Sequence, residues 1–183
     1  MPLTSKEAAE SLAQAENARR RSAQIYSYSQ SSPHLIMWGT IWVLGYTQND
    51  LLPRYENWGW ILLILAGAIG GAIIGRRHAL LDRGPLAWRM LAVAAVAVFF
   101  VFATYTIMWP VRGAAMTVFP ALITGTLQTA IGLWAGLRYV ITGVTVIAAT
   151  MGGFFFLHEH LLLWMAFVGG GSMILAGFWF RKV

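Results

Sequence analysis

WGWILLILAGAIGGAIIGRR, residues Trp58 to Arg77, is the stretch of sequence that decides the fold. Between Gly59 and Gly75 it contains no charged side chain and no side-chain amide. A helix of about 20 apolar residues crosses a bilayer, and a lone segment in hydrocarbon must be helical to satisfy its own backbone hydrogen bonds. Tryptophans at one end and arginines at the other suit the two membrane interfaces. The stretch therefore predicts a transmembrane helix.

Five other apolar stretches resemble it, and the composition is that of a membrane protein. The 183 residues are 58% apolar and 11% charged, whereas soluble domains carry about 25% charged residues. We predict an all-α, polytopic membrane protein in which one domain, residues 32–183, forms a bundle of six transmembrane helices. The expected helices cover residues 33–52, 58–76, 87–109, 114–135, 140–157 and 161–180.

Residues 1–31 are polar and alanine-rich and precede the first expected span. Thr4 and Glu7 fit a capping box, and small apolar residues follow at helical spacing, so we predict an amphipathic cytoplasmic or interfacial helix. Ser32 is suited to be the N-cap of the first span, with Pro33 as its first residue. The leader has no apolar core of a signal peptide. Three interpretations are open: the leader lies along the inner membrane surface, docks on a partner or on its own bundle, or is a solvated helix.

The distribution of basic residues predicts the orientation. Cytoplasmic segments of membrane proteins are enriched in Lys and Arg. With the N-terminus inside, eleven basic residues fall on inside segments and two, Arg54 and Arg112, on outside turns. We therefore expect both termini in the cytoplasm and a location in the bacterial inner membrane. The eleven are Lys6, Arg19, Arg20, Arg21, Arg76, Arg77, Arg83, Arg89, Arg138, Arg181 and Lys182.

The net charge of +6 would suggest a nucleic-acid partner in a soluble protein. Here the basic residues stand at span ends, so membrane lipid is the expected partner and nucleic acid is not. We assign lipid headgroup contacts to Arg76, Arg77, Arg83 and Arg181. The chain has no cysteine, which excludes disulfides and thiolate chemistry. No ionisable residue lies in the middle of a span, which argues against proton-coupled transport.

The turn formed by His158, Glu159 and His160 contains the only cluster of candidate metal ligands in the sequence. Histidine and carboxylate groups suit zinc or a similar divalent ion. However, residues two apart do not share a helical face, and further ligands would have to come from elsewhere. A polar turn between two apolar spans is the alternative interpretation. No other cofactor is predicted, and no hydrolase constellation is present.

Polar and small residues form stripes on three expected spans. Thr117, Thr124 and Gln128 recur at helical spacing on the fourth span, and Thr145 and Ser172 belong to similar stripes on the fifth and sixth. These residues either line a path for a small neutral solute or lipid, or form interhelical hydrogen bonds and close contacts that hold the bundle together. Gln128 is expected to point into the bundle, because an amide facing lipid is costly.

Glycines allow helix backbones to approach closely, so five of them are expected at helix-packing faces. They are Gly67, Gly71, Gly75, Gly132 and Gly136. These small-residue faces are more than a six-helix monomer needs. They therefore favour a non-enzymatic membrane protein that forms a homo-oligomer or packs as an accessory subunit of a larger membrane complex. The alternatives are a channel or carrier for a small neutral solute or lipid, and a membrane metal-binding protein or enzyme that uses His158 and His160.

Overall fold

A computed structural model describes residues 5–79, 85–108 and 113–182, and within these ranges the chain is helical and contains no strand. Four helical segments are long and apolar enough to cross a membrane. They comprise residues Pro53–Arg76, Ala114–Ala135, Leu137–Phe156 and His158–Arg181. Among the residues whose side chains are described, α3 adds a further apolar segment, Ala95–Ile107.

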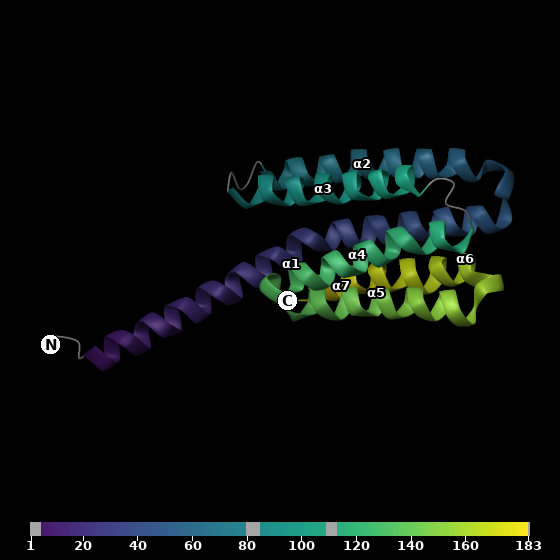
Figure 1. Cartoon of the computed structure of the whole chain (residues 1–183). Coiled ribbons are helices and arrows are strands. Elements are labelled where there is room, and N and C mark those ends of the chain that lie inside the picture. The colour runs from purple at the N-terminus through teal and green to yellow at the C-terminus, as the bar shows by residue number, and fades with distance from the viewer. Residues whose placement is uncertain (1–4, 80–84, 109–112, 183) are drawn as a thin grey trace.

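The helices run alternately in opposite directions along one axis (Figure 1). The elements are α1 (Ser5–Leu51), α2 (Glu56–Ala79), α3 (Pro85–Ile107), α4 (Ala114–Ala135), α5 (Leu137–Phe156), α6 (Leu161–Trp164), the π-helix η3 (Met165–Gly170) and α7 (Gly171–Arg181). The 3-10 turns η1 (Pro53–Tyr55) and η2 (His158–His160) lie at the same end of the molecule. The C-terminus lies at the opposite end, where α1 leaves the bundle.

The first helix does not begin at Ser32 and Pro33, as the sequence suggested. Helix α1 runs without a break from Ser5 to Leu51 and contains Pro33 in its interior. Its N-terminal part projects from the bundle as a straight extension (Figure 1). An interior proline removes one backbone hydrogen bond and normally kinks or ends a helix. Here Tyr28 and Leu35 are buried on both sides of Pro33, so packing holds the helix together across it.

Close backbone contact joins α1 to the last helical segment. A Cβ atom added to Gly39 would lie 2.7 Å from the carbonyl oxygen of Gly170, and one added to Gly170 would lie 2.8 Å from that of Gly39. Nearer the C-terminal end of α7, Gly177 packs against Ser32 and Ile36. Only residues without a side chain fit between backbones at this distance.

Helices α4 and α5 form a second tightly packed pair. A Cβ on Gly125 would be 2.9 Å from the carbonyl oxygen of Gly143, so the two glycines face one another. Tyr46 of α1 donates a hydrogen bond of 3.0 Å to the carbonyl oxygen of Thr117 and so connects this pair to α1. The core consequently lies between α1, α4, α5 and the segment from α6 to α7.

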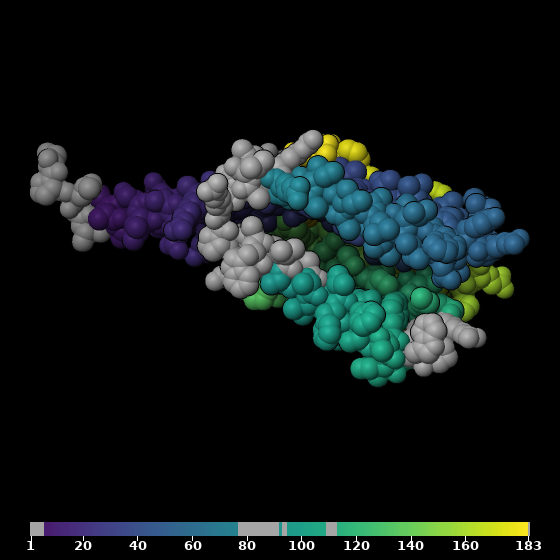
Figure 2. All heavy atoms as spheres, turned by 90° about the horizontal axis from the view of Figure 1, so that it is seen from above, coloured from purple at the N-terminus to yellow at the C-terminus, as the bar shows by residue number. Residues whose placement is uncertain are grey.

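Helix α2 lies at the edge of the molecule, on α1. Gly67 packs against Trp38 and Ile41, and Gly45 of α1 packs against Trp60. In the space-filling view, α2 and α3 form separate ridges, with α4 visible between them (Figure 2). Only 6% of the most apolar window of Pro53–Arg76 is buried, compared with 44% for His158–Arg181.

The segment expected as one uniform helix over 161–180 contains a π-helical stretch, η3. Met165 and Ala166 in this stretch are fully buried, and Gly169 and Gly170 are also buried. The stretch ends in two glycines, Gly169 and Gly170, and Gly171 begins α7; none of the three has a side chain to stabilise regular α-helix geometry. The helix therefore keeps its direction while its hydrogen-bond register changes at the point of closest approach to α1.

Candidate functional site

The densest polar cluster lies where α1 leaves the bundle. The Tyr139 hydroxyl is within hydrogen-bond distance of the Ser27 hydroxyl, at 2.9 Å, and of the Ser31 hydroxyl. It also lies 2.9 Å from the carbonyl oxygen of Ser27, to which it can donate. Residues 27 and 31 are one helical turn apart, so both serines face the same tyrosine on α5. This contact fixes the base of the projecting part of α1.

Three aromatic rings pack beneath these hydroxyls. The Tyr28 and Tyr139 centroids are each 4.9 Å from that of Phe180, with rings tilted towards edge-to-face geometry. Phe180 is completely buried. Gly136, which joins α4 to α5, has φ of +132° and packs against the Tyr28 ring. A side chain there would be strained by the backbone and would meet Tyr28. The cluster thus couples α1, the α4–α5 turn and the C-terminal end of α7.

Arg138 is held against this cluster by backbone groups. Its Nη1 donates a 2.7 Å hydrogen bond to the Trp179 carbonyl oxygen, and its Nη2 a 3.4 Å hydrogen bond to that of Lys182. The guanidinium carbon lies 5.3 Å from the Tyr28 ring centroid and 5.0 Å from that of Trp179. Among the side chains that the structure describes, the only salt bridge joins Arg20 to Glu16. Arg138 is therefore a fixed cation with no carboxylate to neutralise it among those residues.

Ser32 has a different role from the N-cap that the sequence suggested. It is completely buried and donates a 2.7 Å hydrogen bond to the carbonyl oxygen of Gly177. Its hydroxyl also accepts a 3.1 Å hydrogen bond from Nε of Arg181. The serine therefore connects α1 to α7. It lies inside a continuous helix and does not cap a helix terminus.

A hollow of about 500 Å³ opens beside the cluster. It lies in the corner between the projecting part of α1 and the N-terminal end of α5. Arg21, Gln24, Ile25 and Tyr28 line it from one face of α1, since they are spaced three and four residues apart. The other wall is formed by Leu137, Arg138, Ile141 and Trp179. Cationic, amide, aromatic and aliphatic groups meet in this hollow.

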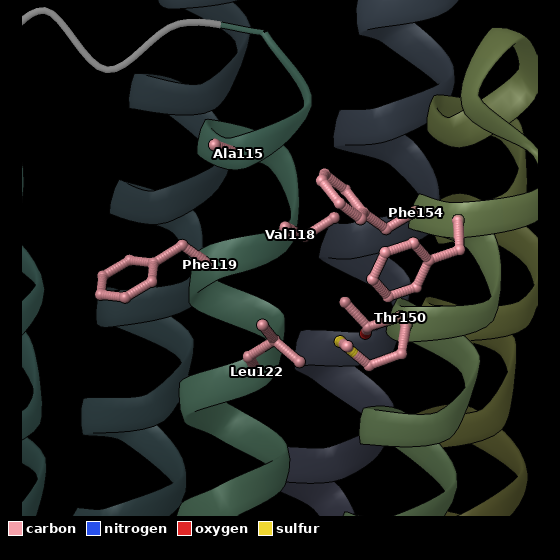
Figure 3. A pocket seen from close by; sticks show the side chains of 8 residues that line it. Ala115, Val118, Phe119, Leu122, Thr150 and Phe154 are labelled. Carbon is pink, nitrogen blue, oxygen red and sulfur yellow. The ribbon is translucent and has the colours of Figure 1, made fainter.

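A second cavity, of about 230 Å³, lies between α4 and α5 towards the other end of the molecule (Figure 3). Val118 and Leu122 line it from α4, and Thr150 and Phe154 from α5. The Thr150 hydroxyl donates to the carbonyl oxygen of Val146 within its own helix, so it offers no free donor to a ligand. This cavity suits an apolar group.

The turn of His158, Glu159 and His160 forms η2, and all three residues are exposed. Among the described residues, no group of three or more His, Asp or Glu side chains is placed to hold a metal ion. The structure therefore adds no ligand to the two histidines.

The proposed pore-facing hydroxyls bond to their own helices. Thr124 donates to the carbonyl oxygen of Pro120, Thr145 to that of Ile141, and Ser172 to that of Gly169, each at 2.8 Å. Thr145 is exposed on α5. None of these residues, and neither Thr117 nor Gln128, lines either cavity described above. The Oε1 atom of Gln128 is buried without a hydrogen-bond partner among the described residues.

The expected packing glycines have different surroundings. Gly67 packs on Trp38, Gly132 on Val140, and Gly136 on Tyr28. Around Gly71, the nearest atoms to an added Cβ are 3.8 Å away, and around Gly75 no described atom lies within 4 Å. Of the expected headgroup arginines, Arg76 is exposed and Arg181 bonds Ser32. Arg83 and the side chain of Arg77 lie outside the described residues.

Sequence reasoning did not identify the Tyr28, Tyr139 and Arg138 cluster. Arg138 and Tyr139 follow Gly136 directly, and in the sequence they mark only a short turn. The available signal was the pair of serines at 27 and 31 around Tyr28, which share a helix face if the leader helix extends to residue 31. Comparison with protein-family models, curated proteins and solved structures finds no match for this chain.

Proposed function

We propose that this chain is a non-enzymatic integral membrane protein that associates with a second copy of itself through α2. In this proposal, α1 and α3 join the four long apolar segments as membrane-crossing helices, and both termini lie in the cytoplasm. The basic residues support this orientation, since Arg76, Arg138 and Arg181 all stand at the end of the molecule that carries the C-terminus.

The burial of α2 is the observation that supports self-association most directly. Among the described residues, α2 contacts the rest of the chain mainly through α1, and most of its described side chains are exposed. One exposed flank contains Ala68, Ala72 and Gly75, which lie four and three residues apart. Small residues at this spacing allow two membrane helices to approach closely. Several other glycines offered by the sequence are already occupied by contacts within the chain, which leaves α2 as the favoured flank.

The carrier alternative has weaker support. The hydroxyls of Thr124, Thr145 and Ser172 bond carbonyls of their own helices and do not converge on a shared cavity. The buried Oε1 of Gln128 is the one observation in its favour, since a buried acceptor without a partner can accept from a passing solute. A structural membrane protein needs no such path, and the closely packed glycine contacts fit that function.

Single-cysteine cross-linking tests the proposed association. The chain contains no cysteine, so Ala68→Cys introduces a unique thiol on the small-residue flank. Its neighbour Ile69, which is 62% exposed, lies at the same depth but about 100° around the helix, and Ile69→Cys is the matched control. In native membranes under mild oxidant, we expect a disulfide-linked dimer from Ala68→Cys and little from Ile69→Cys. Equal, weak cross-linking from both positions would refute association through this flank.

A further inference from the structure

The hollow at the base of the projecting part of α1 has the chemical features of a site for a charged amphiphile. Its cationic groups are Arg21 on α1 and Arg138 on α5. Its volume, about 500 Å³, falls within the range of small-molecule pockets, roughly 300–1,000 Å³. The two walls come from parts of the chain more than a hundred residues apart. The hydrogen bond between Ser27 and Tyr139, and the one from the backbone N–H of Arg138 to the Tyr28 hydroxyl, hold them together.

The guanidinium of Arg138 is held in a position that suits the binding of an anion. Two carbonyl oxygens and two aromatic rings fix its position, yet these use only part of the five N–H donors of a guanidinium. A guanidinium presents a fork of donors that matches the oxygens of a phosphate. Arg21 is exposed on the facing wall and makes no salt bridge among the described residues. An anion in the hollow would thus meet two cations and, on the same wall as Arg21, the amide of Gln24.

An apolar surface leads away from these cations along α5. Leu137, Ile141 and Val144 are 69%, 44% and 50% exposed and stand four and three residues apart, so they form one stripe. Ile25 adds an exposed aliphatic side chain to the facing wall. Trp179 lines the same hollow, with its ring centroid 5.0 Å from the guanidinium carbon of Arg138, and tryptophans favour the level of lipid headgroups. A soluble anion would use the arginines but would leave the stripe uncovered.

We infer that this hollow binds one anionic phospholipid, with Arg138 and Arg21 on its phosphate and the Leu137–Ile141 stripe against an acyl chain. The inference rests on the proposed membrane location, which places this end of the bundle at the inner leaflet. The bound lipid joins the base of α1 to the end of α5, and its occupancy follows the content of anionic lipid in the membrane.

Native mass spectrometry of the full-length protein, released from detergent in the presence of phosphatidylglycerol or phosphatidylcholine, tests this inference. We expect one phosphatidylglycerol to be retained in preference to phosphatidylcholine. Arg21→Gln should weaken that retention about tenfold, the equivalent of one lost charge-assisted contact. Arg20→Gln is the matched control, because Arg20 is exposed on the same helix but pairs with Glu16 and does not line the hollow. Arg138→Gln should also weaken retention, although it removes bonds to α7 as well.

Three outcomes would overturn the assignment. Equal retention of the two lipids would show that anionic charge is not recognised. Equal effects of Arg21→Gln and Arg20→Gln would place the lipid elsewhere. Full displacement by excess inorganic phosphate would identify a free phosphate site rather than a lipid site. Each of these leaves the cross-linking of Ala68→Cys unaffected, so failure of the lipid site is distinguishable from failure of the proposed self-association.

Discussion

At the scale of single residues, the distance between α1 and the last helical segment depends on glycine. Gly170 lies so close to α1 that an added Cβ would be 2.8 Å from the carbonyl oxygen of Gly39 and 2.9 Å from the backbone nitrogen of Val43. Backbone atoms cannot move aside as the end of a flexible side chain can. Its neighbour Gly171 has no described atom within 4 Å of an added Cβ. The two glycines therefore form a matched pair in one segment.

We expect Gly170→Ala to lower the free energy of unfolding by about 1–3 kcal/mol, the usual cost of overpacking. Gly171→Ala should be neutral or stabilise by up to about 1 kcal/mol, because alanine is the better helix former. Thermal unfolding in mild detergent, followed by the loss of monodisperse protein, measures both variants. If Gly171→Ala were as destabilising as Gly170→Ala, the close contact with α1 would not be the cause.

The buried Tyr139 hydroxyl shows why some functional residues escape sequence reasoning. A tyrosine after an arginine at a predicted span end is typical of a membrane interface. Its partners Ser27 and Ser31 are more than a hundred residues earlier, in a leader that was expected to be a separate helix. No local pattern indicates such a contact. The serines share a helix face within the leader itself, but only the structure shows that this face meets α5.

At the scale of elements, α1 contains two environments in one helix. Residues 6–26 are exposed, whereas the part after Tyr28 carries a buried stripe that includes Leu35, Trp42 and Tyr46. Forming the first turn of an isolated helix is unfavourable in water. The bundle supplies the nucleus, and the exposed part extends from it with little tertiary contact. Its alanine-rich sequence has the propensity to continue the helix.

Ala18→Pro should separate these two parts of α1. A proline in a helix interior removes a hydrogen bond and costs about 3 kcal/mol, which the exposed part cannot recover through packing. We expect loss of helical circular dichroism from the residues before position 18 and faster trypsin cleavage near Arg19. Ala18→Ser is the control that keeps the backbone donor. Thermal stability of the bundle should be unchanged, and a large loss would mean that the extension supports the core.

The segments predicted at 58–76 and 114–135 are helical in α2 and α4, and most of 140–157 is helical in α5. Each contains a long stretch without a charged side chain; α4 ends at its C-cap, Gly136, and α5 ends before the polar turn at 158–160, whereas α2 continues past Arg76 to Ala79. The prediction failed at Pro33, where tertiary packing overrides a local stop signal, and at residues 165–170, where the change to π-helix depends on contact with α1. The apolar pattern therefore predicts which segments are helical, but not how the helices join or where they touch.

At the scale of the whole molecule, the alternation of helix directions places two groups of residues at opposite ends. Glu56 and Glu159 stand near the turns at one end, and Lys182 at the other. If six helices cross the membrane with both termini inside, these ends face opposite compartments. Four crossings by the long apolar segments alone would distribute the same residues differently, so the number of crossings is open to direct test.

Single-cysteine labelling of intact cells measures this arrangement. We expect Glu159→Cys to react with a membrane-impermeant maleimide in intact cells, and Lys182→Cys to react only after lysis. Both residues are exposed in the structure, so a difference in labelling reports the compartment rather than burial. Labelling of Lys182→Cys in intact cells would place the C-terminus outside and would reverse the assignment of every turn.

The unbroken passage of α1 through Pro33 has a mechanical consequence. Residues 5–28 form an arm roughly 35 Å long, at 1.5 Å per residue, that is continuous with a rod buried in the bundle. Because no joint separates the two, a tilt of about 10° in the buried half would swing the tip by about 6 Å. Small rearrangements of the packed helices would thus be amplified into a large displacement of the tip of the arm.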